Sequence, residues 1–276
     1  MAPGTLISIL PEKQTIQLTS GYEFNFDDTP YCNKSTKENA SNLVSLFSES
    51  CETRAHICPE LGQANVLALS GGLDSRSVAA CLAVNKIPFT AVTRLDSSKM
   101  SLVDAHIAKI LAARLSATWR SIDVGSMKAA DILTLLRLKS GMNPLGVASR
   151  VQFLDRLQSL HGSGIVFFTG DGGDKVFCDL RPSRTVRTFD ALIRYIISQE
   201  QIFELSDVSL MTGMHADDIV HDIRTQLSKY PEVKLAQKYI HFLMFERAFK
   251  WLFEGEDRNR CYFWSVAPFY SIPLFI

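Results

Sequence analysis

The sequence predicts an α/β fold: an open, mostly parallel five-stranded sheet flanked by helices, with a helical C-terminal portion. Short apolar runs bounded by turn residues alternate with segments whose apolar residues recur at helical spacing, which is typical of strand–helix–strand units. Two of these runs end directly in turns rich in glycine and aspartate, and helical patterns dominate from about residue 188 to residue 253. This alternation indicates right-handed crossovers and an open parallel sheet. In such sheets ligands bind beyond the carboxyl ends of the strands, so we expect a site there.

Composition narrows the class of protein. The 276 residues are 46% hydrophobic, enough for a buried core, and the 29 basic residues balance the 29 acidic ones. This balance gives no electrostatic signal for a nucleic-acid partner. No apolar run is long enough to span a bilayer, and the N-terminus does not have the pattern of a secretory signal, so we predict no membrane partner.

Cysteine usage indicates the compartment. The six cysteines are scattered without a Cys-x-x-Cys pair, so we interpret them as reduced thiols of a cytoplasmic protein and do not expect zinc binding. They are Cys32, Cys51, Cys58, Cys81, Cys178 and Cys261.

The N-terminal part is predicted to be a short β-rich segment over residues 1–35. The apolar run Leu6–Leu10 and the alternating run Thr15–Thr19 favour a hairpin or two edge strands. Ser35 and Glu38 then have the spacing of a capping box, which predicts a helix running to about Cys51. We expect the second domain to extend over residues 36–276.

Four further strands are expected along the chain. They lie at Val66–Leu69, Phe89–Thr93, Thr118–Val124 and Gly164–Thr169. Helices are expected directly after the first of these strands and at roughly 101–115, 126–140 and 148–160. The aromatic segment from Cys261 to Ile276 is too apolar for a free tail, so we expect it to pack against the sheet or to form an interface.

The first glycine turn is Ser70-Gly71-Gly72-Leu73-Asp74-Ser75. Its glycines permit a sharp turn and a close approach of a ligand to the backbone. Ser70, Asp74 and Ser75 lie at the expected start of a helix, where free N–H groups favour an anion. There is no lysine after the glycines and no Gly-x-Gly-x-x-Gly, so neither common phosphate loop is present. The pattern therefore predicts either a phosphate site of another kind or an ordinary packing turn.

The second turn is Thr169-Gly170-Asp171-Gly172-Gly173-Asp174-Lys175, directly after a predicted buried strand. Its aspartates offer oxygen ligands for a hard cation, although Asp-Gly pairs also occur in ordinary turns. It is not an EF-hand, because the ligand ladder and the terminal glutamate are missing. Two such turns at the ends of two strands of one sheet favour a shared site for an anion and a cation.

The first turn resembles the pyrophosphate loop of the ATP pyrophosphatases. Together, the two turns resemble the synthetase domain of the asparagine synthetase family, which also includes β-lactam synthetases and lasso-peptide cyclases. The similarity extends over about residues 36–276, and the preceding residues resemble the tail of the family's glutaminase domain. The resemblance implies an adenine nucleotide alpha hydrolase-like fold and an ATP-dependent, amide-forming ligase. In this family MgATP adenylates a small-molecule carboxylate substrate, pyrophosphate leaves, and ammonia or an amine attacks the acyl adenylate.

The same resemblance implies roles for particular residues. Asp74 and Asp174 would bind Mg²⁺ and pyrophosphate, Asp171 would assist the chemistry, and Arg258 would lie near the cleft. The backbone and hydroxyl groups of the first turn would bind pyrophosphate, and other positions would line the adenosine pocket. The first set is Ser70, Gly71, Gly72 and Ser75, and the second is Ala68, Val92, Thr169 and Gly170.

The chain departs from the family pattern in three places. Residue 2 is alanine where glutamine-using members have the nucleophilic cysteine, so ammonia would come from a separate glutaminase or another source. Lys175 replaces an acidic residue. The segment Val266–Ser271 lacks the family's arginine. The family's catalytic lysine lies further on, beyond Ile276, so the lysine would be Lys250, another residue or a partner's, or the protein would be a fragment. Glu254–Arg260, dense in charge, is predicted to be a solvated loop that in the family lies near the cleft.

Two other functions remain open. A different ATP pyrophosphatase, acting in sulfur transfer or tRNA modification, would be expected to carry a basic stripe or a reactive cysteine pair, and the sequence shows neither. A non-catalytic nucleotide-binding relative would agree with the missing glutaminase domain. The sequence predicts neither the acid and the amine nor the oligomeric state.

Overall fold

The computed structural model describes residues 4–21, 24–27, 33–56 and 64–274. The chain divides into two compact units, and each is formed by segments that are distant in the sequence. The sheet unit contains residues 34–178 and 250–275, and the helical unit contains residues 1–33 and 179–249. The proposed domains 1–35 and 36–276 stay predictions.

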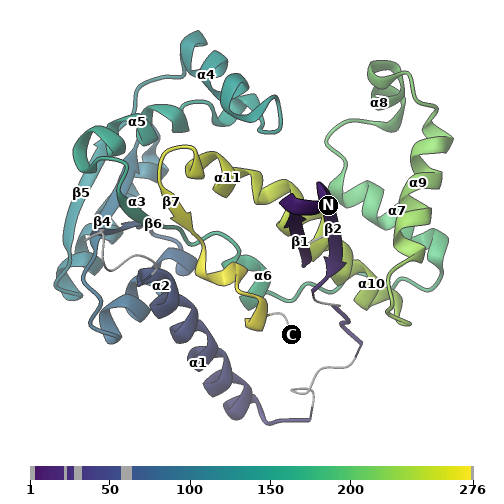
Figure 1. Ribbon diagram of the computed structural model, residues 1–276, viewed down its shortest axis with the longest axis horizontal. Helices are drawn as coiled ribbons and strands as arrows, with labels where there is room; N and C mark the ends of the chain where they lie inside the picture. Colours follow the sequence, from purple (N-terminus) through teal and green to yellow (C-terminus); the bar gives the residue numbers. More distant parts are fainter. Residues whose placement is uncertain (1–3, 22–23, 28–32, 57–63, 275–276) are drawn as a thin grey trace. The chain divides into compact units, whose positions relative to one another are not determined.

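The sheet unit is built on five parallel strands in the order β5–β4–β3–β6–β7 (Figure 1). The strands are β3 (Ala64–Ala68), β4 (Thr90–Leu95), β5 (Thr118–Asp123), β6 (Ile165–Phe168) and β7 (Trp264–Val266). The predicted fold class is thereby confirmed. The fifth strand comes from the aromatic C-terminal segment, which pairs with β6.

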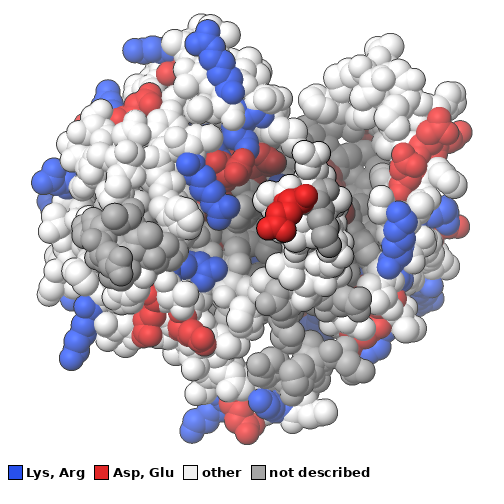
Figure 2. All heavy atoms as spheres, viewed as in Figure 1, with Lys and Arg blue, Asp and Glu red and all other residues white. Residues whose placement is uncertain are grey.

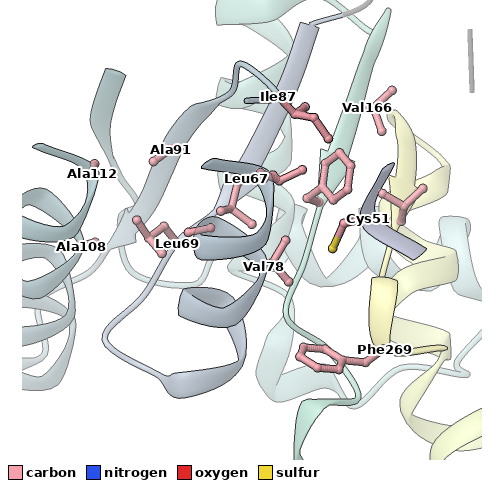
Figure 3. Packing of buried hydrophobic residues seen from close by; sticks show 14 of the residues in the cluster. Cys51, Leu67, Leu69, Val78, Ile87, Ala91, Ala108, Ala112, Val166 and Phe269 are labelled. Atoms are coloured by element: carbon pink, nitrogen blue, oxygen red, sulfur yellow. The ribbon is translucent and has the colours of Figure 1, made fainter. Parts of the chain in front are cut away.

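Alternating side chains of the sheet point into two separate cores. Leu67 belongs to a cluster that contains Phe47 and Cys51 of α1 and Val78 of α2, as Figure 3 shows for most of these residues. Its neighbour Val66 belongs to a second cluster formed with α5. This division follows from the two-residue repeat of a strand, which sends successive side chains to opposite faces. Strands buried on both faces explain why their sequences are almost continuously apolar.

The helices that cover the two faces agree with the predicted positions to within a few residues. One face is covered by α1 (Thr36–Ala55), α2 (Leu73–Val84) and α3 (Lys99–Arg114), and the other by α5 (Arg150–His161). The remaining helices of this unit are α4 (Ala129–Lys139), α6 (Gly173–Phe177) and α11 (Glu254–Arg260). The capping box predicted at Ser35 and Glu38 is present at the start of α1.

The strand order creates one switch point in the sheet. β3 pairs with β4 on one side and with β6 on the other. Successive strands extend the sheet away from β3 in one direction up to β5, and the chain then returns to place β6 on the opposite side. At such a point the connections diverge and leave a crevice beyond the carboxyl ends of the two strands. Both glycine turns of the sequence follow these two strands.

The helical unit contains a hairpin and four α-helices in its described residues. Strands β1 (Thr5–Leu10) and β2 (Thr15–Ser20) are antiparallel, as predicted. The helices are α7 (Phe189–Glu200), α8 (Leu205–Thr212), α9 (Ala216–Ser228) and α10 (Leu235–Phe242), followed by a π-helical segment, η4 (Leu243–Leu252). Its core includes Leu192, Ile196, Leu227 and Tyr239.

A buried polar pair ties the N-terminal residues to this unit. The Glu232 carboxylate, 2% exposed, accepts a hydrogen bond from the Phe26 backbone N–H at 3.2 Å and lies 2.7 Å from His241 Nδ1. Burial lowers the pKa of His241 in spite of this partner. The buried Phe24 ring also packs edge-on against Phe245 at 4.9 Å between centroids. These contacts explain why residues far apart in the sequence form one unit.

The structure shows how the charged side chains are distributed and in which state the described cysteines are. Figure 2 shows basic and acidic side chains interspersed over one face, in line with the zero net charge. In the part of the chain that the structure describes, no helix has the length and apolarity required to cross a bilayer. Four cysteines, Cys51, Cys81, Cys178 and Cys261, are free thiols, and Cys32 and Cys58 lie outside the described residues.

One prediction of local structure is wrong. The charged segment Glu254–Arg260 is a helix, α11, and three of its polar residues are buried. Glu256, Arg258 and Asn259 are 0%, 3% and 6% exposed. The segment can be buried because these groups hydrogen-bond to residues of distant segments, which a reading of the local sequence does not show.

Candidate active site

Two loops at the switch point form the candidate site. The first loop, Leu69–Gly72, connects β3 to α2, and the second loop, Thr169–Gly172, connects β6 to α6. Thr93, at the carboxyl-terminal half of β4, donates a hydrogen bond from Oγ1 to the Leu69 carbonyl at 2.7 Å and accepts one from Trp119 Nε1 at 3.0 Å. The neighbouring strands therefore fix the position at which the first loop begins.

The first loop is stabilised by its own polar groups. The backbone N–H of Ser70 donates to Ser75 Oγ at 3.1 Å, and the N–H of Gly72 donates to Ser70 Oγ at 3.1 Å. The N–H of Gly71 donates to the carboxylate of Asp104 in α3 at 3.0 Å. The conformation of the loop is thus held by hydrogen bonds within the protein.

The helix that follows begins without a side-chain cap. Gly72 is the N-cap residue of α2 and makes no capping hydrogen bond through a side chain. The first N–H groups of this 12-residue helix carry the positive end of the helix dipole and have no intrahelical acceptor. Such a helix start at the carboxyl end of a strand is a suitable site for an anion, and phosphate groups bind at equivalent places in nucleotide-binding folds.

The second loop lies directly against Asp74, the second residue of α2. A Cβ atom added to Gly173 would lie 2.4 Å from Asp74 Cγ, and one added to Gly170 would lie 2.6 Å from the backbone N of Ser75. The backbone N–H of Asp174 hydrogen-bonds to the Asp74 carboxylate. Glycine is therefore required at both positions for the loops to approach each other, and Asp74 and Asp174 lie at the same rim.

Three carboxylates gather at this meeting point. Burial, and then the negative charges of Asp174 and Asp171, raise the pKa of Asp74. Lys175 Nζ lies 2.5 Å from the Asp174 carboxylate and offsets part of this charge. Among the described residues no group of three or more His, Cys, Asp or Glu side chains could hold a metal ion alone. A pair of carboxylates that repel each other nevertheless fits Mg²⁺, which commonly takes one or two carboxylates and completes its shell with phosphate oxygens.

A cavity of about 420 Å³ opens in front of the first loop. All the residues predicted to bind the nucleotide line this cavity except Gly71, which lies within the first loop. The residues that line it are Ala68, Ser70, Gly72, Asp74, Ser75, Val92, Thr169 and Gly170. The predicted catalytic residues Asp171 and Arg258 line it as well. Asp174 lines a second cavity of about 370 Å³, which shares Asp74 and Asp171 with the first.

Sequence reasoning missed a buried carboxyl group behind the second loop. Glu256 of α11 accepts hydrogen bonds from Thr169 Oγ1 and, at 2.7 Å, from Ser265 Oγ. It also hydrogen-bonds to the Asp171 side chain. Burial and the nearby Asp171 charge raise the pKa of Glu256 to about 7. In the sequence, the helical spacing of Glu256, Asn259 and Phe263 was a signal for a helix with one buried face, but the dense charge of the segment favoured a loop.

Two arginines line both cavities, and a third, Arg94, lines the first and pairs with Asp96 at 3.0 Å. Arg258 is 3% exposed and donates to Asn143 Oδ1 and Asn259 Oδ1, each at 3.2 Å, whereas its Nε makes no hydrogen bond. Burial and the neighbouring Arg150 lower the pKa of Arg258 to about 10. Arg150, the first residue of α5, is exposed and lines both cavities. No lysine of the described residues, Lys250 included, lines either cavity.

The uncapped glycine turn and the facing aspartate loop thus lie at the switch point of a parallel sheet, the place where nucleotide phosphates bind in open α/β folds. A family model described as asparagine synthase matches residues 63–232, more than half of the chain. The chain therefore belongs to the asparagine synthase family, and its class is that of ATP-dependent, amide-forming ligases.

Solved structures with a similar fold are distant in sequence. The chain is similar to the NH3-dependent NAD synthetase from Campylobacter jejuni, with 17% identity, 77% of this chain and 96% of that chain covered, and a TM-score of 0.36. It is also similar to NMN synthetase from Francisella tularensis, with 16% identity, coverage of 76% and 93%, and a TM-score of 0.33. Likenesses this distant say nothing about substrate. The comparison with curated proteins gives no match.

Proposed function

We propose that this protein activates a carboxylic acid by adenylation with MgATP and transfers the acyl group to ammonia or an amine. The observation that carries the proposal is the meeting of the two loops: Gly170 and Gly173 leave no space between the aspartate loop and the start of α2. An anion at the uncapped helix and a cation at the facing carboxylates would then lie side by side. This is the arrangement that a magnesium-bound pyrophosphate group requires.

The first loop would bind the β- and γ-phosphates, which leave as pyrophosphate. Its hydroxyl groups, Ser70 Oγ and Ser75 Oγ, lie 3.1 Å apart and can reorient to donate to phosphate oxygens. Ala68 and Val92 line the same cavity and would contact adenosine. Asp74 and Asp174 would hold Mg²⁺, which on binding neutralises the phosphate charge that develops as the α–β bond breaks.

The amine step requires loss of a proton from the attacking nitrogen. Asp171 is exposed in the cavity and lies next to Glu256, which is buried. We propose that Asp171 accepts this proton and that Glu256 positions its carboxylate through their mutual hydrogen bond. A carboxylate within hydrogen-bond reach of the nucleophile is a sufficient general base for this step.

The experiment is a measurement of pyrophosphate release from MgATP in the presence of candidate acids with ammonia or an amine. Asp74→Asn and Asp174→Asn should each lower the rate by about 10²–10³-fold, the loss typical of removing one electrostatic contact to a transition state. Asp179→Asn changes an exposed aspartate that lines neither cavity and should retain the rate. Full activity of both site variants would contradict the proposal.

A second candidate function is nucleotide binding without turnover. It is favoured by the finding that no lysine of the described residues lines either cavity, whereas the family resemblance implies a catalytic one. Binding of a nucleotide without pyrophosphate release under any combination of acid and amine would support it. Release together with AMP formation would support the ligase.

A further inference from the structure

The second cavity, of about 370 Å³, indicates the chemical class of the acid substrate, and this inference rests on the proposed function. Five residues line both cavities and form their boundary: Asp74, Arg150, Gly170, Asp171 and Arg258. If the nucleotide occupies the first cavity, the reacting carboxylate must lie at this boundary. The rest of the acid must then extend into the second cavity, because the phosphates fill the other side.

The boundary holds two of the three arginines that line the two cavities; the third, Arg94, lines the first cavity and pairs with Asp96 at 3.0 Å. The exposed guanidinium of Arg150 and the buried guanidinium of Arg258 are both found there, and the Nε of Arg258 lacks a hydrogen bond. Asn143, 5% exposed, holds the Arg258 guanidinium at 3.2 Å. A planar guanidinium whose orientation is fixed in this way suits a carboxylate partner.

Beyond the boundary, apolar and aromatic side chains form one wall of the second cavity, which is completed by Asn143, Asp174 and two glycines. This wall is formed by Pro144, Val147, Trp251, Leu252 and Tyr270. The Tyr270 ring is held edge-on by Phe253 at 5.3 Å between centroids. A Cβ on Gly172, whose φ is +92°, would lie 3.1 Å from the same ring, so the second loop packs closely against it. The wall is therefore a supported surface of aromatic and aliphatic side chains.

Charge in this part of the cavity disfavours a second acidic group. Of the described residues that line only the second cavity, Asp174 is the one with a charged side chain, and none carries a cation. The lysine that pairs with Asp174, Lys175, lines neither cavity. A carboxylate at the far end of the acid would therefore lose its water at this wall without gaining a cationic side chain as a partner.

We propose that the acyl substrate is a monocarboxylic acid with an aromatic or aliphatic body, and that a dicarboxylic acid such as aspartate is excluded. The carboxylate binds at the guanidinium groups of Arg150 and Arg258, at the boundary of the two cavities. The body packs between the Pro144–Val147 turn and the aromatic residues Trp251 and Tyr270. The volume of the cavity lies within the range of ordinary small-molecule sites.

The test titrates the full chain, with Mg²⁺ and the non-cleavable analogue α,β-methylene-ATP present, with 3-phenylpropanoate and separately with succinate and aspartate. Calorimetry gives each affinity. We expect 3-phenylpropanoate to bind at least about 10-fold more tightly than either dicarboxylate, a difference typical of an apolar pocket. Tryptophan emission should change on binding, and Trp251→Phe should remove this change while Trp264→Phe retains it. Tighter binding of succinate or aspartate overturns the proposal.

A charge variant tests specificity directly. Val147→Lys places a cation in the wall of the second cavity and should reduce the preference for 3-phenylpropanoate over succinate by about 10-fold or more. Leu145→Lys is the matched control, since Leu145 belongs to the same turn, is 47% exposed and lines neither cavity. An unchanged preference in Val147→Lys, with the analogue still bound, counts against the assigned position of the acid.

The outcomes separate this inference from the function on which it rests. If the analogue binds but neither class of acid does, the substrate class is overturned and the nucleotide site stands. If the analogue does not bind and no pyrophosphate is released, the proposed function is overturned.

Discussion

At the scale of single residues, the site depends on two glycines that have no side chain as much as on its polar groups. Gly170 and Gly173 are needed because Ser75 and Asp74 occupy the space of a side chain. Gly173 has no unusual backbone angle, so an alanine there is disfavoured by its contact alone. Geometry at the loop interface can therefore be tested without removing a functional group.

Gly173→Ala should displace the Asp74 carboxylate, because the new Cβ would lie 2.4 Å from its Cγ. Pyrophosphate release should fall by about 10–100-fold, since a displacement of about 1 Å in a catalytic site can cost that much. The control is Gly164→Ala, where an added Cβ meets nothing within 4 Å. Equal rates for the two variants would show that the contact between the loops does not matter for catalysis.

The buried Glu256 leads to a prediction about how the free energy of unfolding depends on pH. Burial raises its pKa to about 7 from the ordinary value of 4.5, so between these values the folded protein binds more protons than the unfolded chain. The Glu256 contribution to stability is thus fully present below pH 4.5 and is lost as the pH rises through 7. The total loss is about 3 kcal/mol in the free energy of unfolding.

Urea unfolding of the wild type and of Glu256→Gln at pH 5 and pH 8 measures this contribution. The wild type should lose more stability than the variant between the two pH values, because glutamine does not titrate. Glu204→Gln, an exposed change in the helical unit, should behave as the wild type does. Parallel changes in the wild type and Glu256→Gln would show that the buried carboxyl group is not protonated at pH 5.

At the scale of elements, α11 connects the site to the rest of the sheet unit. Its residues Glu254 and Asp257 pair with Lys139, at the end of α4, and Glu254 Oε2 lies 2.6 Å from Lys139 Nζ. Lys139 is 8% exposed; burial disfavours its charge, but the two carboxylates outweigh this and raise the pKa of its ammonium group. A long buried side chain with two partners fixes the position of the helix that carries Glu256 and Arg258.

Lys139→Met should lower the free energy of unfolding by about 1–3 kcal/mol, below the cost of breaking a fully buried ion pair because Asp257 is half exposed. Chemical denaturation measures the change. Lys128→Met, at the exposed start of the same helix, is the control. In the double variant Lys139→Met with Glu254→Gln, the loss should be smaller than the sum of the two single losses. Strict additivity would indicate that the two side chains do not interact.

The elements also show which parts of the structure are readable from sequence. The strand and helix around Ser70–Ser75 follow local rules: an apolar run, two glycines and a helical repeat, and each of these patterns was predicted. Strand β7 has only three residues and is formed by pairing with β6, so no local pattern marks it. The burial of α11 was missed for a similar reason, because the hydrogen bonds that satisfy Glu256 come from Thr169 and Ser265.

At the scale of the whole molecule, the chain contributes to the helical unit twice, and sequence order alone could not reveal this. The apolar stripe of α7 marks a core face, but it does not show that Phe24 packs in the same unit. The sequence predicted the residues at the rim of the candidate site, because strand order and loop composition follow general rules. It did not predict the second cavity, whose wall comes from three separate segments.

Binding of α,β-methylene-ATP with Mg²⁺ should protect backbone amides from hydrogen exchange in residues 69–76 and 169–175. The reason is that bound ligand stabilises the structure that surrounds it. The core helix α7 of the helical unit serves as internal reference, and its exchange should not change. Protection of α7 without protection of the two loops would place the nucleotide elsewhere.

The late position of β7 and α11 in the chain has a consequence for biosynthesis. Both glycine loops leave the ribosome well before residues 250–266, which supply the edge strand of the sheet and the helix behind Thr169. A nascent chain arrested at residue 240 would have the first glycine turn but neither Arg258 nor Glu256. If the proposed function holds, nucleotide should therefore be retained by chains that extend beyond Val266 and not by this arrested intermediate.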